Sequence, residues 1–593
     1  MGRYFAQRLI LAGFTLLLVS IIVFTLLRVI VPLVYVDAVD IIAGEYGHSD
    51  PELAAQLREE YGLSGNVVLQ YLEWLGGIVR LDLGESLFNG REVSTELWDR
   101  LPVSLELGIV GLLSGVLISV PMGVVAAVWQ DRWPDYVFRT FAIILNSVPG
   151  FWLAILIITF GSLWFNWAPP LKFKYLWEDP IAHIKIMALP ALLIGLTPSA
   201  GLMRIVRTQM LEVMRQDYIR TAQAKGLAGH VVIFRHAMRN ALIPVVTVIG
   251  LSLPGLIAGT AIFESIFTLP GMGQYLVSTR GSGTDMANTI RASALEFGPR
   301  ALKERPLPLR PLFWLLRFAR RKPLGFVGMV MVVTLIFVAI FADQIATYPA
   351  NKLDLKHRLE GPSARHWLGT DSTGKDTFSR LVYGAKISMT VGFGAVAISA
   401  AGAATLGMIS GFFGGWFDKI LQRFVDAWQA MPGLIILITI LGIVRRMPNV
   451  DLVLAMLVAI GLLTIAGSSR VIRSQVLLVK QAPFVEAAHS MGAGSGRIII
   501  YCILPNVFPL ILVNATVALG GVILAEASLS FLGFGPAGEP SWGQMLSVEG
   551  REYMRKQPGL AVFPGLCIGI AVFGFNIFGD ALRDVLDPRL RRR

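Results

Sequence analysis

Two stretches of the chain share a residue pattern suited to docking on another protein. They read Asp217-Tyr-Ile-Arg-Thr-Ala-Gln-Ala-Lys-Gly226 and, 266 residues later, Pro483-Phe-Val-Glu-Ala-Ala-His-Ser-Met-Gly492. An asparagine follows each glycine after 14 residues, Asn240 in the first copy and Asn506 in the second. Alanine and long side chains favour helix, and glycine adopts the left-handed conformation that ends one. We therefore expect a short helix, a sharp turn and a second helix in each copy, which fits a groove on a partner and can pass movement to membrane helices.

The alternative is that each stretch is only a basic connector between two membrane helices. Matched spacing in two copies favours docking over that alternative. Docking has to be rigid, because moving a two-state equilibrium from about 1:99 to 99:1 takes about 5.5 kcal/mol. The residues expected to make contacts or form the turns are Tyr218, Thr221, Ala222, Gly226 and Asn240 in the first copy, and Phe484, Glu486, Ala487, Ala488, Gly492 and Asn506 in the second.

The composition is that of a polytopic membrane protein. Of 593 residues, 54% are hydrophobic and 16% are charged, whereas soluble proteins have nearer a quarter of their residues charged. The net charge of +12 comes from basic residues beside apolar runs, which is typical of cytoplasmic loops and not of a nucleic-acid-binding surface. Residues 204–239, around the first docking stretch, hold 7 basic and 2 acidic residues and are expected inside the cell. Cys502 and Cys567 make neither a disulfide framework nor a metal cluster, so no metal site is expected.

Five apolar runs of the first half are long enough to cross a bilayer, which takes about 20 residues. The first run exceeds the short core of a signal peptide and no cleavage site follows, so we interpret it as an uncleaved helix with its amino end in the cytoplasm. Residues 33–100 hold 13 acidic and 4 basic residues, which suits the outer side, and short amphipathic helices are predicted there at Leu57–Tyr61 and Val68–Leu75. The five runs are 9–31, 104–128, 137–163, 187–208 and 241–263.

The second half is predicted to be regular, with six spans. The loop 344–385 is expected on the outer side and contains the motif from His366 to Asp371. Gly369, Asp371 and Gly374 either shape a turn before the following helix, which we favour, or belong to a functional site. The six spans are 323–343, 386–412, 423–443, 451–474, 508–531 and 559–580.

The docking stretches and motifs in both halves resemble a known family. Thr221-Ala-Gln-Ala-Lys-Gly226 and Glu486-Ala-Ala-His-Ser-Met-Gly492 look like the EAA loops of ABC-importer permeases. The match is to the dipeptide/oligopeptide/nickel permease family and covers most of the chain. Residues 1–279 resemble its B-type permease and residues from about 286 to 593 its C-type permease. The B-type motifs are Leu81-Asp-Leu-Gly-Glu-Ser86, Arg100-Leu-Pro-Val-Ser104 and Leu269-Pro-Gly-Met-Gly-Gln274, and the C-type motifs are His366-Trp-Leu-Gly-Thr-Asp371, Ser379-Arg-Leu-Val-Tyr-Gly384, Leu529-Ser-Phe-Leu-Gly533 and Leu586-Asp-Pro-Arg589.

The resemblance implies an all-α, type I importer fold with two related halves around a central path, in the cytoplasmic (inner) membrane of a prokaryote. It also implies the partners. Two cytoplasmic ABC ATPases, one on each EAA loop, would use ATP and Mg²⁺, and an extracytoplasmic binding protein would deliver a peptide-like substrate. The chain has no G-x-x-x-x-G-K-[ST] phosphate loop, so neither ATP hydrolysis nor a bound cofactor is expected of the chain itself.

The chain departs from the family between its halves. A B-type permease carries a sixth span after Gln274, but residues 280–322 hold 10 basic and 3 acidic residues and no run of 20 apolar ones. Five spans would leave this linker outside, although its charges favour the cytoplasm. We predict a first half of residues 1–279 without its last span, a linker of residues 280–322 and a complete second half of residues 323–593, about 11 spans in all. Two adjacent genes joined near Met286 would explain this, and either the linker re-enters, another segment is partly inserted or the first half is impaired.

Acidic residues near the bilayer are rare and usually functional. Glu264 and Glu526 occupy similar places, a little before Gly273-Gln274 and Gly543-Gln544, and Glu106 is a third such acid. Each faces the path or the outer loops, or else stabilises a helix end through hydrogen bonds, which we favour. Pro149 interrupts the span 137–163, and a broken helix is tolerated in a membrane only where protein or a cavity satisfies its backbone. The candidates for the path or outer loops are Pro149, Glu264, Gln274, Glu526 and Gln544.

Two other functions stay open from the sequence. A secondary transporter driven by an ion gradient would also be polytopic and internally repeated, but it needs buried charged residues near the centres of its spans, and few are present. A fused chain that inserts without transporting is the other, because a span is missing. The resemblance allows dipeptides, longer peptides, nickel complexes and some glycans or opines as substrates, and peptides are expected from their frequency in the family.

Overall fold

The computed structural model describes residues 2–30, 65–86, 91–170, 172–278, 323–445, 450–536, 538–547 and 549–586 of the chain. Every regular element within these ranges is a helix, and β-structure is limited there to two isolated bridges, Glu85–Glu92 and Thr370–Asp376. The predicted all-α fold is therefore confirmed. The predicted helix Leu57–Tyr61 and the predicted linker 280–322 lie outside the described residues.

The first half runs from α1 to α13. The predicted helix Val68–Leu75 lies within α5, which packs on α1 with the Ser20 Oγ atom 2.8 Å from the Tyr71 hydroxyl. The elements are α1 (Gly2–Thr25), the π-helical turn η1 (Leu26–Ile30), α5 (Val67–Val79), α6 (Val93–Val128), α7 (Trp133–Ser147), α8 (Gly150–Phe165), α9 (Pro180–Met214), α10 (Asp217–Ala224), α11 (Gly229–Val231), the π-helical turn η3 (Val232–Ala237), α12 (Met238–Phe267) and α13 (Met272–Ser278).

The second half runs from α15 to α26. Two of its long helices begin at aspartates, Asp376 before α17 and Asp451 before α20, whose side chains accept hydrogen bonds from backbone N–H groups of the first turn. The elements are α15 (Pro323–Ile340), α16 (Ala342–Ile345), the 3-10 turn η4 (Leu355–His357), α17 (Thr377–Phe413), α18 (Gly415–Ala430), α19 (Gly433–Val444), α20 (Leu452–Val479), α21 (Pro483–Ser490), α22 (Ser495–Arg497), the π-helical turn η5 (Ile498–Ile503), α23 (Leu504–Leu529), the π-helical turn η6 (Ser530–Phe534), α24 (Trp542–Ser547), α25 (Glu549–Glu552) and α26 (Gly559–Leu586).

By length and composition, the described residues contain 9 helices able to cross a membrane, or up to 11 spans when each of two bent helix pairs is counted as one. The bent pairs are α7 with α8, at 93°, and α18 with α19, at 77°. Counted in this way, five spans belong to the first half and six to the second. Among the described residues, the predicted 5 and 6 spans are therefore present, and the segment where a sixth span of the first half would follow lies outside them.

The span predicted as continuous over 423–443 is in fact broken, so the second half is not regular. Met431 has ψ 133° and Pro432 has ψ 104°, both extended, and α19 starts only at Gly433. Proline lacks an N–H group and its ring pushes the preceding residue out of the helical region. The break therefore repeats the one at Pro149, where Val148 has ψ 119° and α8 starts at Gly150.

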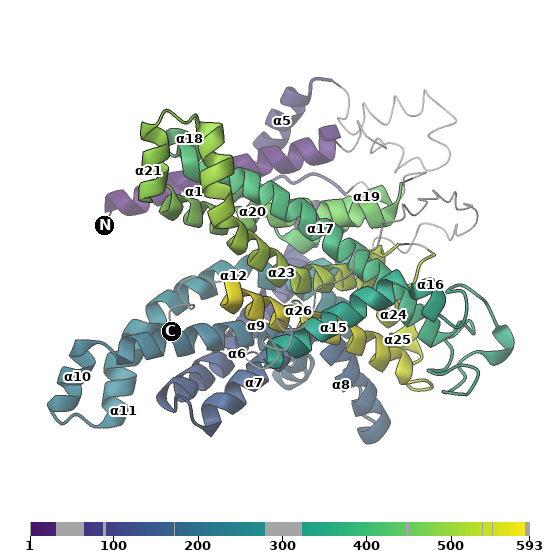
Figure 1. The fold of residues 1–593 in the computed structure, drawn as a ribbon. Helices are drawn as coiled ribbons and strands as arrows, with labels where there is room; N and C mark the ends of the chain where they lie inside the picture. Colours follow the sequence, from purple (N-terminus) through teal and green to yellow (C-terminus); the bar gives the residue numbers. More distant parts are fainter. Residues whose placement is uncertain are drawn as a thin grey trace, which may run out of the picture.

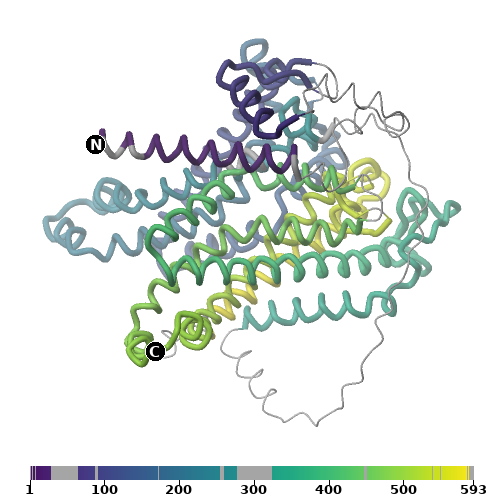
Figure 2. The backbone as a smooth tube through the Cα atoms, turned by 90° about the horizontal axis from the view of Figure 1, so that it is seen from above, coloured from purple at the N-terminus to yellow at the C-terminus, as the bar shows by residue number. Residues whose placement is uncertain are grey.

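The two copies of the docking stretch lie at the same end of the molecule. Figure 1 shows α10 with α11 and, separately, α21 at the end where α1 begins, whereas α16, α24 and α25 lie at the opposite end. The view from above in Figure 2 agrees, with the chain near residue 225 and the chain near residue 490 both projecting on the side of the N-terminus. We call this side the loop end and the opposite side the far end.

The halves pack on one another over a shared core. The largest cluster of buried apolar side chains contains residues of α6, α8, α9 and α12 from the first half and of α15, α17, α19, α20, α23 and α26 from the second. α26 packs on α15 and α23 of its own half and also reaches α7 and α8, while α19 contacts α12. Among the described residues, α26 has no counterpart in the first half.

Candidate functional site

The two docking stretches have the same backbone path. α10 ends beside Gly226, whose φ is +77°, and α21 ends beside Gly492, whose φ is +80°. A Cβ atom at either glycine would meet no other atom within 4 Å, so the glycines are required by the backbone conformation and not by crowding. Each turn leads through a short helix and a π-helical turn into a long span, α12 or α23. The predicted helix, turn and second helix are present in both copies.

One face of each docking helix is fixed to its own half. Ile219 and Ala222 of α10 are buried against Val206 and Met210 of α9. The same cluster contains Val124 and Ala127 of α6. In the second half, the equivalent cluster is made by Val485, Ala488, Ile472, Val476 and Phe412. Ala222 and Ala488 therefore anchor the docking helices and do not face a partner.

The other face of each docking helix is exposed. Tyr218 has 43% of its surface exposed and Phe484 has 46%, at positions separated by the same 266 residues as the glycines. Thr221, Glu486 and Ala487 are exposed too. Each helix thus presents an aromatic ring away from the protein, at the loop end. The two exposed aromatic side chains stand at equivalent positions of the two docking helices.

The asparagines that close the two stretches act differently. Asn240 Nδ2 donates to the Tyr218 hydroxyl at 2.8 Å and so ties α10 to α12. Both asparagines also donate to the carbonyl oxygen four residues earlier, Asn240 to His236 at 3.4 Å and Asn506 to Cys502 at 2.7 Å, but Phe484 has no hydroxyl to accept a second bond in the second copy. Sequence reasoning expected the same role for both asparagines.

The predicted acids Glu264 and Glu526 are both completely buried, and Glu264 holds a helix end. Glu264 accepts hydrogen bonds from Ser104 Oγ at 2.6 Å and from the backbone N–H groups of Gly273 and Gln274 at 2.7 and 3.1 Å. These amides belong to the first turn of α13, whose free N–H groups favour a carboxylate.

Glu526 is held in a related way. It accepts from Ser388 Oγ at 2.9 Å and from Ser530 Oγ at 2.8 Å. Ser388 and Ser104 begin the matching sequences Ser-x-x-x-Gly in the two halves. Gln544, the counterpart of Gln274, receives no carboxylate, and its N–H donates to Ser541 Oγ at 3.3 Å. Glu264 therefore has the geometry of the helix-end interpretation, whereas Glu526 is bonded by serine hydroxyls of α17 and of the turn after its own helix.

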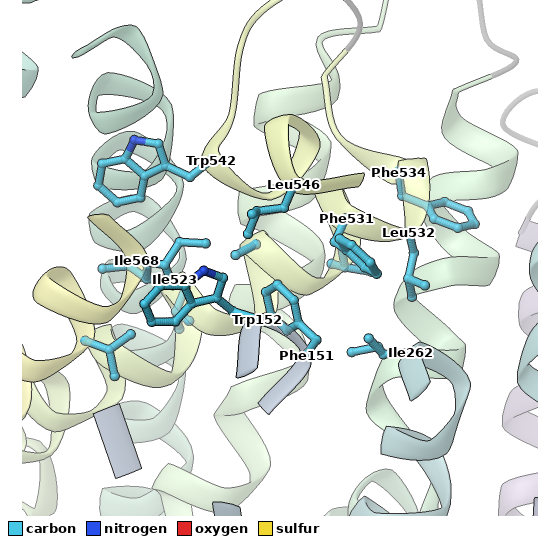
Figure 3. Packing of buried hydrophobic residues seen from close by; sticks show 14 of the residues in the cluster. Phe151, Trp152, Ile262, Ile523, Phe531, Leu532, Phe534, Trp542, Leu546 and Ile568 are labelled. Carbon is cyan, nitrogen blue, oxygen red and sulfur yellow. The ribbon is translucent and has the colours of Figure 1, made fainter. Parts of the chain in front are cut away.

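Pro149 lies where the two halves meet. After the turn at Pro149, Phe151 stacks on Phe531 of the second half with ring centroids 5.2 Å apart, and Trp152 Nε1 donates to the Ala561 carbonyl oxygen at 2.9 Å. Figure 3 shows these rings in the layer between the halves near Leu546, with Trp542 further away within the second half. Phe151 and Trp152 are 3% and 8% exposed, so in this conformation the layer is closed by apolar side chains.

Sequence reasoning missed two buried ion pairs, Asp135–Arg207 and Asp418–Arg473. The signal available in the sequence was an arginine next to an apolar run in equivalent positions, 266 residues apart. The partners could not be read from the sequence, because 72 and 55 residues separate each arginine from its aspartate.

The loop at the far end contains the turn that was predicted there. Gly369 and Gly374 have φ of +79° and +78°, and Asp371 accepts from the N–H groups of Thr373 and Lys375 at 2.7 and 2.9 Å. Asp371 also pairs with Arg380, which donates to Glu549 at 2.8 Å.

The two carboxylates that share Arg380 differ in acidity. Burial opposes the ionisation of Asp371, but Arg380 and the hydrogen bonds from Lys375 and Thr373 outweigh it and lower the pKa. Burial raises the pKa of Glu549, and the Arg380 charge only partly offsets it. Asp371 is therefore the more acidic of the two carboxyl groups. Within the described ranges, no three His, Cys, Asp or Glu side chains are arranged to hold a metal ion.

Comparison with known proteins connects this geometry to a family. The family described as binding-protein-dependent transport system inner membrane component matches residues 119–352 and 403–592, and the N-terminal membrane component of such systems matches residues 1–108. The first of these matches runs across the predicted linker.

Individual relatives agree. The chain is 39% identical over 273 residues to the dipeptide transport system permease protein of Alkalihalophilus pseudofirmus, covering 46% of this chain and 88% of that protein. It is also 39% identical over 282 residues to the glutathione transport system permease proteins of Escherichia coli and Pectobacterium atrosepticum, covering 47% of this chain and 90% and 91% of those proteins.

One permease of this kind thus accounts for only about half of the chain, and the inner-membrane component matches twice along it. Permeases of this group are multi-pass subunits of the inner membrane and not enzymes, and the repeated match agrees with the two sets of spans and the two docking stretches. The chain therefore belongs to the ABC-importer permeases of the dipeptide/oligopeptide/nickel family, as a B-type permease fused to a C-type permease.

Proposed function

We propose that this chain forms the translocation path of an ATP-driven importer of dipeptides or oligopeptides and that both EAA loops are docked by cytoplasmic ABC ATPases. We call the stretches Asp217–Gly226 and Pro483–Gly492 the coupling loops. One ATPase binds each loop, and an extracytoplasmic binding protein delivers substrate to the far end. The chain itself binds no cofactor, and ATP and Mg²⁺ are used by the ATPase subunits.

The observation that carries the proposal is the matched geometry of the coupling loops. Both place an aromatic side chain, Tyr218 or Phe484, outward on a helix whose opposite face is buried against its own half. A helix held in this way cannot slide on the protein, so a force on its outer face moves the long spans behind it. Two coupling loops at one end of the molecule suit a partner made of two ATPase subunits.

The closed layer between the halves fits the same proposal. Phe151 and Phe531 meet across it, and a path between the halves at this place would be closed while the two rings stay in contact. Opening requires the halves to separate there, which a partner can drive only through a difference in its affinity for the open and closed states. ATP binding that draws the two loops together supplies such a difference.

Co-purification and transport test the proposal. The chain is expressed with the ATPases and the binding protein encoded beside it, purified, and reconstituted into proteoliposomes with a radiolabelled dipeptide and ATP. We expect two ATPase subunits per chain, and hydrolysis stimulated by the peptide-loaded binding protein. Uptake should persist after proton and sodium gradients are collapsed.

The alternatives give different results in the same assay. Uptake that stops when the ion gradients collapse would identify a secondary transporter. A complex that hydrolyses ATP without any response to the loaded binding protein would identify a fused chain that no longer transports.

A further inference from the structure

Each half contains a buried ion pair between its bent helix pair and the helix that precedes its coupling loop. Arg207 on α9 donates from Nε and Nη2 to the two carboxylate oxygens of Asp135 on α7, at 2.7 and 2.6 Å. Arg473 on α20 donates in the same bidentate way to Asp418 on α18. Asp135 is 0% exposed and Asp418 8% exposed. Two parallel hydrogen bonds fix the orientation of the helices as well as their distance.

In each half, the arginine of the pair lies in the helical turn that packs against the coupling loop. In the first half, Val206 and Met210 on either side of Arg207 pack on Ile219 and Ala222 of α10. α9 ends at Met214 and α10 begins at Asp217, so only a short connection around the extended Gln216 separates the two helices. One turn of α9 therefore touches the coupling loop on one face and α7 on another. The equivalent set in the second half is Ile472, Arg473, Val476, Val485 and Ala488.

The aspartate of each pair lies on a helix that continues toward the contact between the halves. α7 begins two residues before Asp135 and ends at the turn around Pro149. The next residues, Phe151 and Trp152, make the stacking contact and the hydrogen bond to the second half. In the second half, α18 leads through Pro432 to α19, which contacts α12 of the first half. Movement of α9 or α20 can therefore pass through α7 or α18 to the contact between the halves.

Stability alone does not account for these pairs. An ion pair with a buried carboxylate contributes little net stability compared with apolar side chains of similar size, because the buried charge loses its water. The side chains of Arg207 and Arg473 stay 17% and 28% exposed. The advantage of such a pair is a fixed geometry between two groups. Both halves have this same feature at equivalent places, although the residues around it differ. In the second half, Gln422 Nε2 donates to Ser410 Oγ, which in turn donates to Asp418. In the first half, the Asp131 N–H donates to Asp135.

We propose that Asp135–Arg207 and Asp418–Arg473 are positioning residues that transmit movement of the coupling loops to the bent helices and so to the contact between the halves. This inference rests on the proposed function, because it assigns the pairs a role in ATP-driven transport. Without the pairs, the loops still bind the ATPases, but their movement is not passed on.

The test measures dipeptide transported per ATP hydrolysed in the reconstituted complex described above. In the double variant Asp135→Asn, Asp418→Asn, we expect the ATPases to co-purify as with the wild type, hydrolysis without binding protein to stay within twofold, and transport per ATP to fall at least tenfold. In a chain that keeps the Asp418–Arg473 pair, the reversed pair Asp135→Arg with Arg207→Asp should keep transport per ATP within threefold of the wild type. The single variant Asp135→Arg should not.

A matched control lies on the same helix. Asp426 on α18 pairs with Arg423 of its own helix and with Arg470 of α20, and its side chain is 31% exposed, whereas that of Asp418 is 11% exposed. The variant Asp426→Asn is expected to transport within twofold of the wild type. A loss as large as that of the double variant would mean that any ion pair between α18 and α20 serves equally, and would overturn the role assigned to the Asp418–Arg473 pair.

Other outcomes also decide the matter. Unchanged transport per ATP in the double variant would overturn the inference, and so would loss of ATPase co-purification, because the pairs would then serve docking or folding. If the double variant does not fold, Arg207→Lys keeps the charge but not the bidentate geometry, and it should lower transport per ATP about threefold at normal folded yield. An unchanged value there would overturn the inference. If the wild-type chain recruits no ATPase, the proposed function fails and the inference falls with it.

Discussion

Single residues at the coupling loops carry the turn that each loop needs. Gly226 and Gly492 have positive φ, and a Cβ atom at either place would be free of contacts. The cost of replacing them is therefore a backbone cost, about 1–2 kcal/mol for a residue other than glycine in the left-handed region. Because the turn sets the angle between the docking helix and the following span, a strained turn changes how the loop is presented to its partner.

A pair of substitutions at these glycines separates the turn from the docking surface. In the variants Gly226→Val and Gly492→Val, we expect ATP hydrolysis to continue while dipeptide transport falls at least fivefold. Asparagine tolerates the left-handed conformation better than other residues, so Gly226→Asn and Gly492→Asn are matched controls that should keep most transport. Wild-type transport in the valine variants would count against a coupling role for the turns.

At the scale of elements, the loop at the far end depends on an ionised Asp371. Its pKa lies below the ordinary value of about 3.9, so the charge stabilises the folded loop at neutral pH, and this contribution is lost as the pH falls through the lowered pKa. Burial raises the pKa of Glu549, which therefore takes up a proton first as the pH falls.

Hydrogen exchange tests this order. After correction for intrinsic rates, the amides of Thr373 and Lys375 should stay protected from pH 7 to pH 5 and lose protection only below about pH 4, near the ordinary aspartate pKa. The variant Asp371→Asn should exchange faster at pH 7 and show no such acid transition. Protection that disappears already between pH 7 and pH 5 would place the controlling proton on Glu549 instead.

The spans could be predicted from the sequence because each is an apolar run of membrane length, which tertiary structure does not override. The break at Pro432 was missed although its signal, a proline followed by glycine inside an apolar run, is the one noticed at Pro149. The helix ends also differ. α6 begins at Val93, well before the predicted 104, because its first turns are polar and are held by contacts such as the Glu96–Arg100 pair.

The candidate site was predictable only in part, for a physical reason. The turn glycines follow from local backbone preference, which the sequence contains. The inward direction of Ala222 and Ala488 depends on which face of an eight-residue helix meets α9 or α20, and this is set by packing. The Asp135–Arg207 pair depends on α7 lying beside α9, which no local pattern records.

At the scale of the whole molecule, small residues on α26 let the two halves meet closely. Gly565 lies so near Trp152 that a Cβ atom there would overlap the indole ring. One turn further along α26, the nearest atom to a Cβ on Gly569 would be the Ser147 carbonyl oxygen at 3.8 Å, an ordinary contact. The same substitution therefore has opposite consequences at the two positions.

Thermal unfolding of the purified chain measures this difference. Gly565→Ala should destabilise the protein by about 1–3 kcal/mol, the usual effect of overpacking. Gly569→Ala should leave the stability unchanged or raise it by up to about 1 kcal/mol, because alanine is the better helix former. Equal melting temperatures for both variants would show that α26 does not press on α8 as described.

The point where the two halves join is predicted from the sequence. The predicted segments are 1–279, 280–322 and 323–593, and the family match that runs from 119 to 352 crosses both junctions between them. The described part of the first half ends with α13 at Ser278, and that of the second begins with α15 at Pro323. Among the described residues, the first half has no helix equivalent to α26.

The most direct test of the account is the accessibility of the two coupling loops. Single cysteines replace Tyr218 or Phe484 in a chain whose Cys502 and Cys567 are changed to serine, and a membrane-impermeant thiol reagent is applied from each side, with and without the ATPases. The account predicts that both positions are labelled only from the cytoplasmic side and that both are protected when the ATPases are bound. Labelling of either position from the outer side, or labelling that the ATPases leave unchanged, would contradict it.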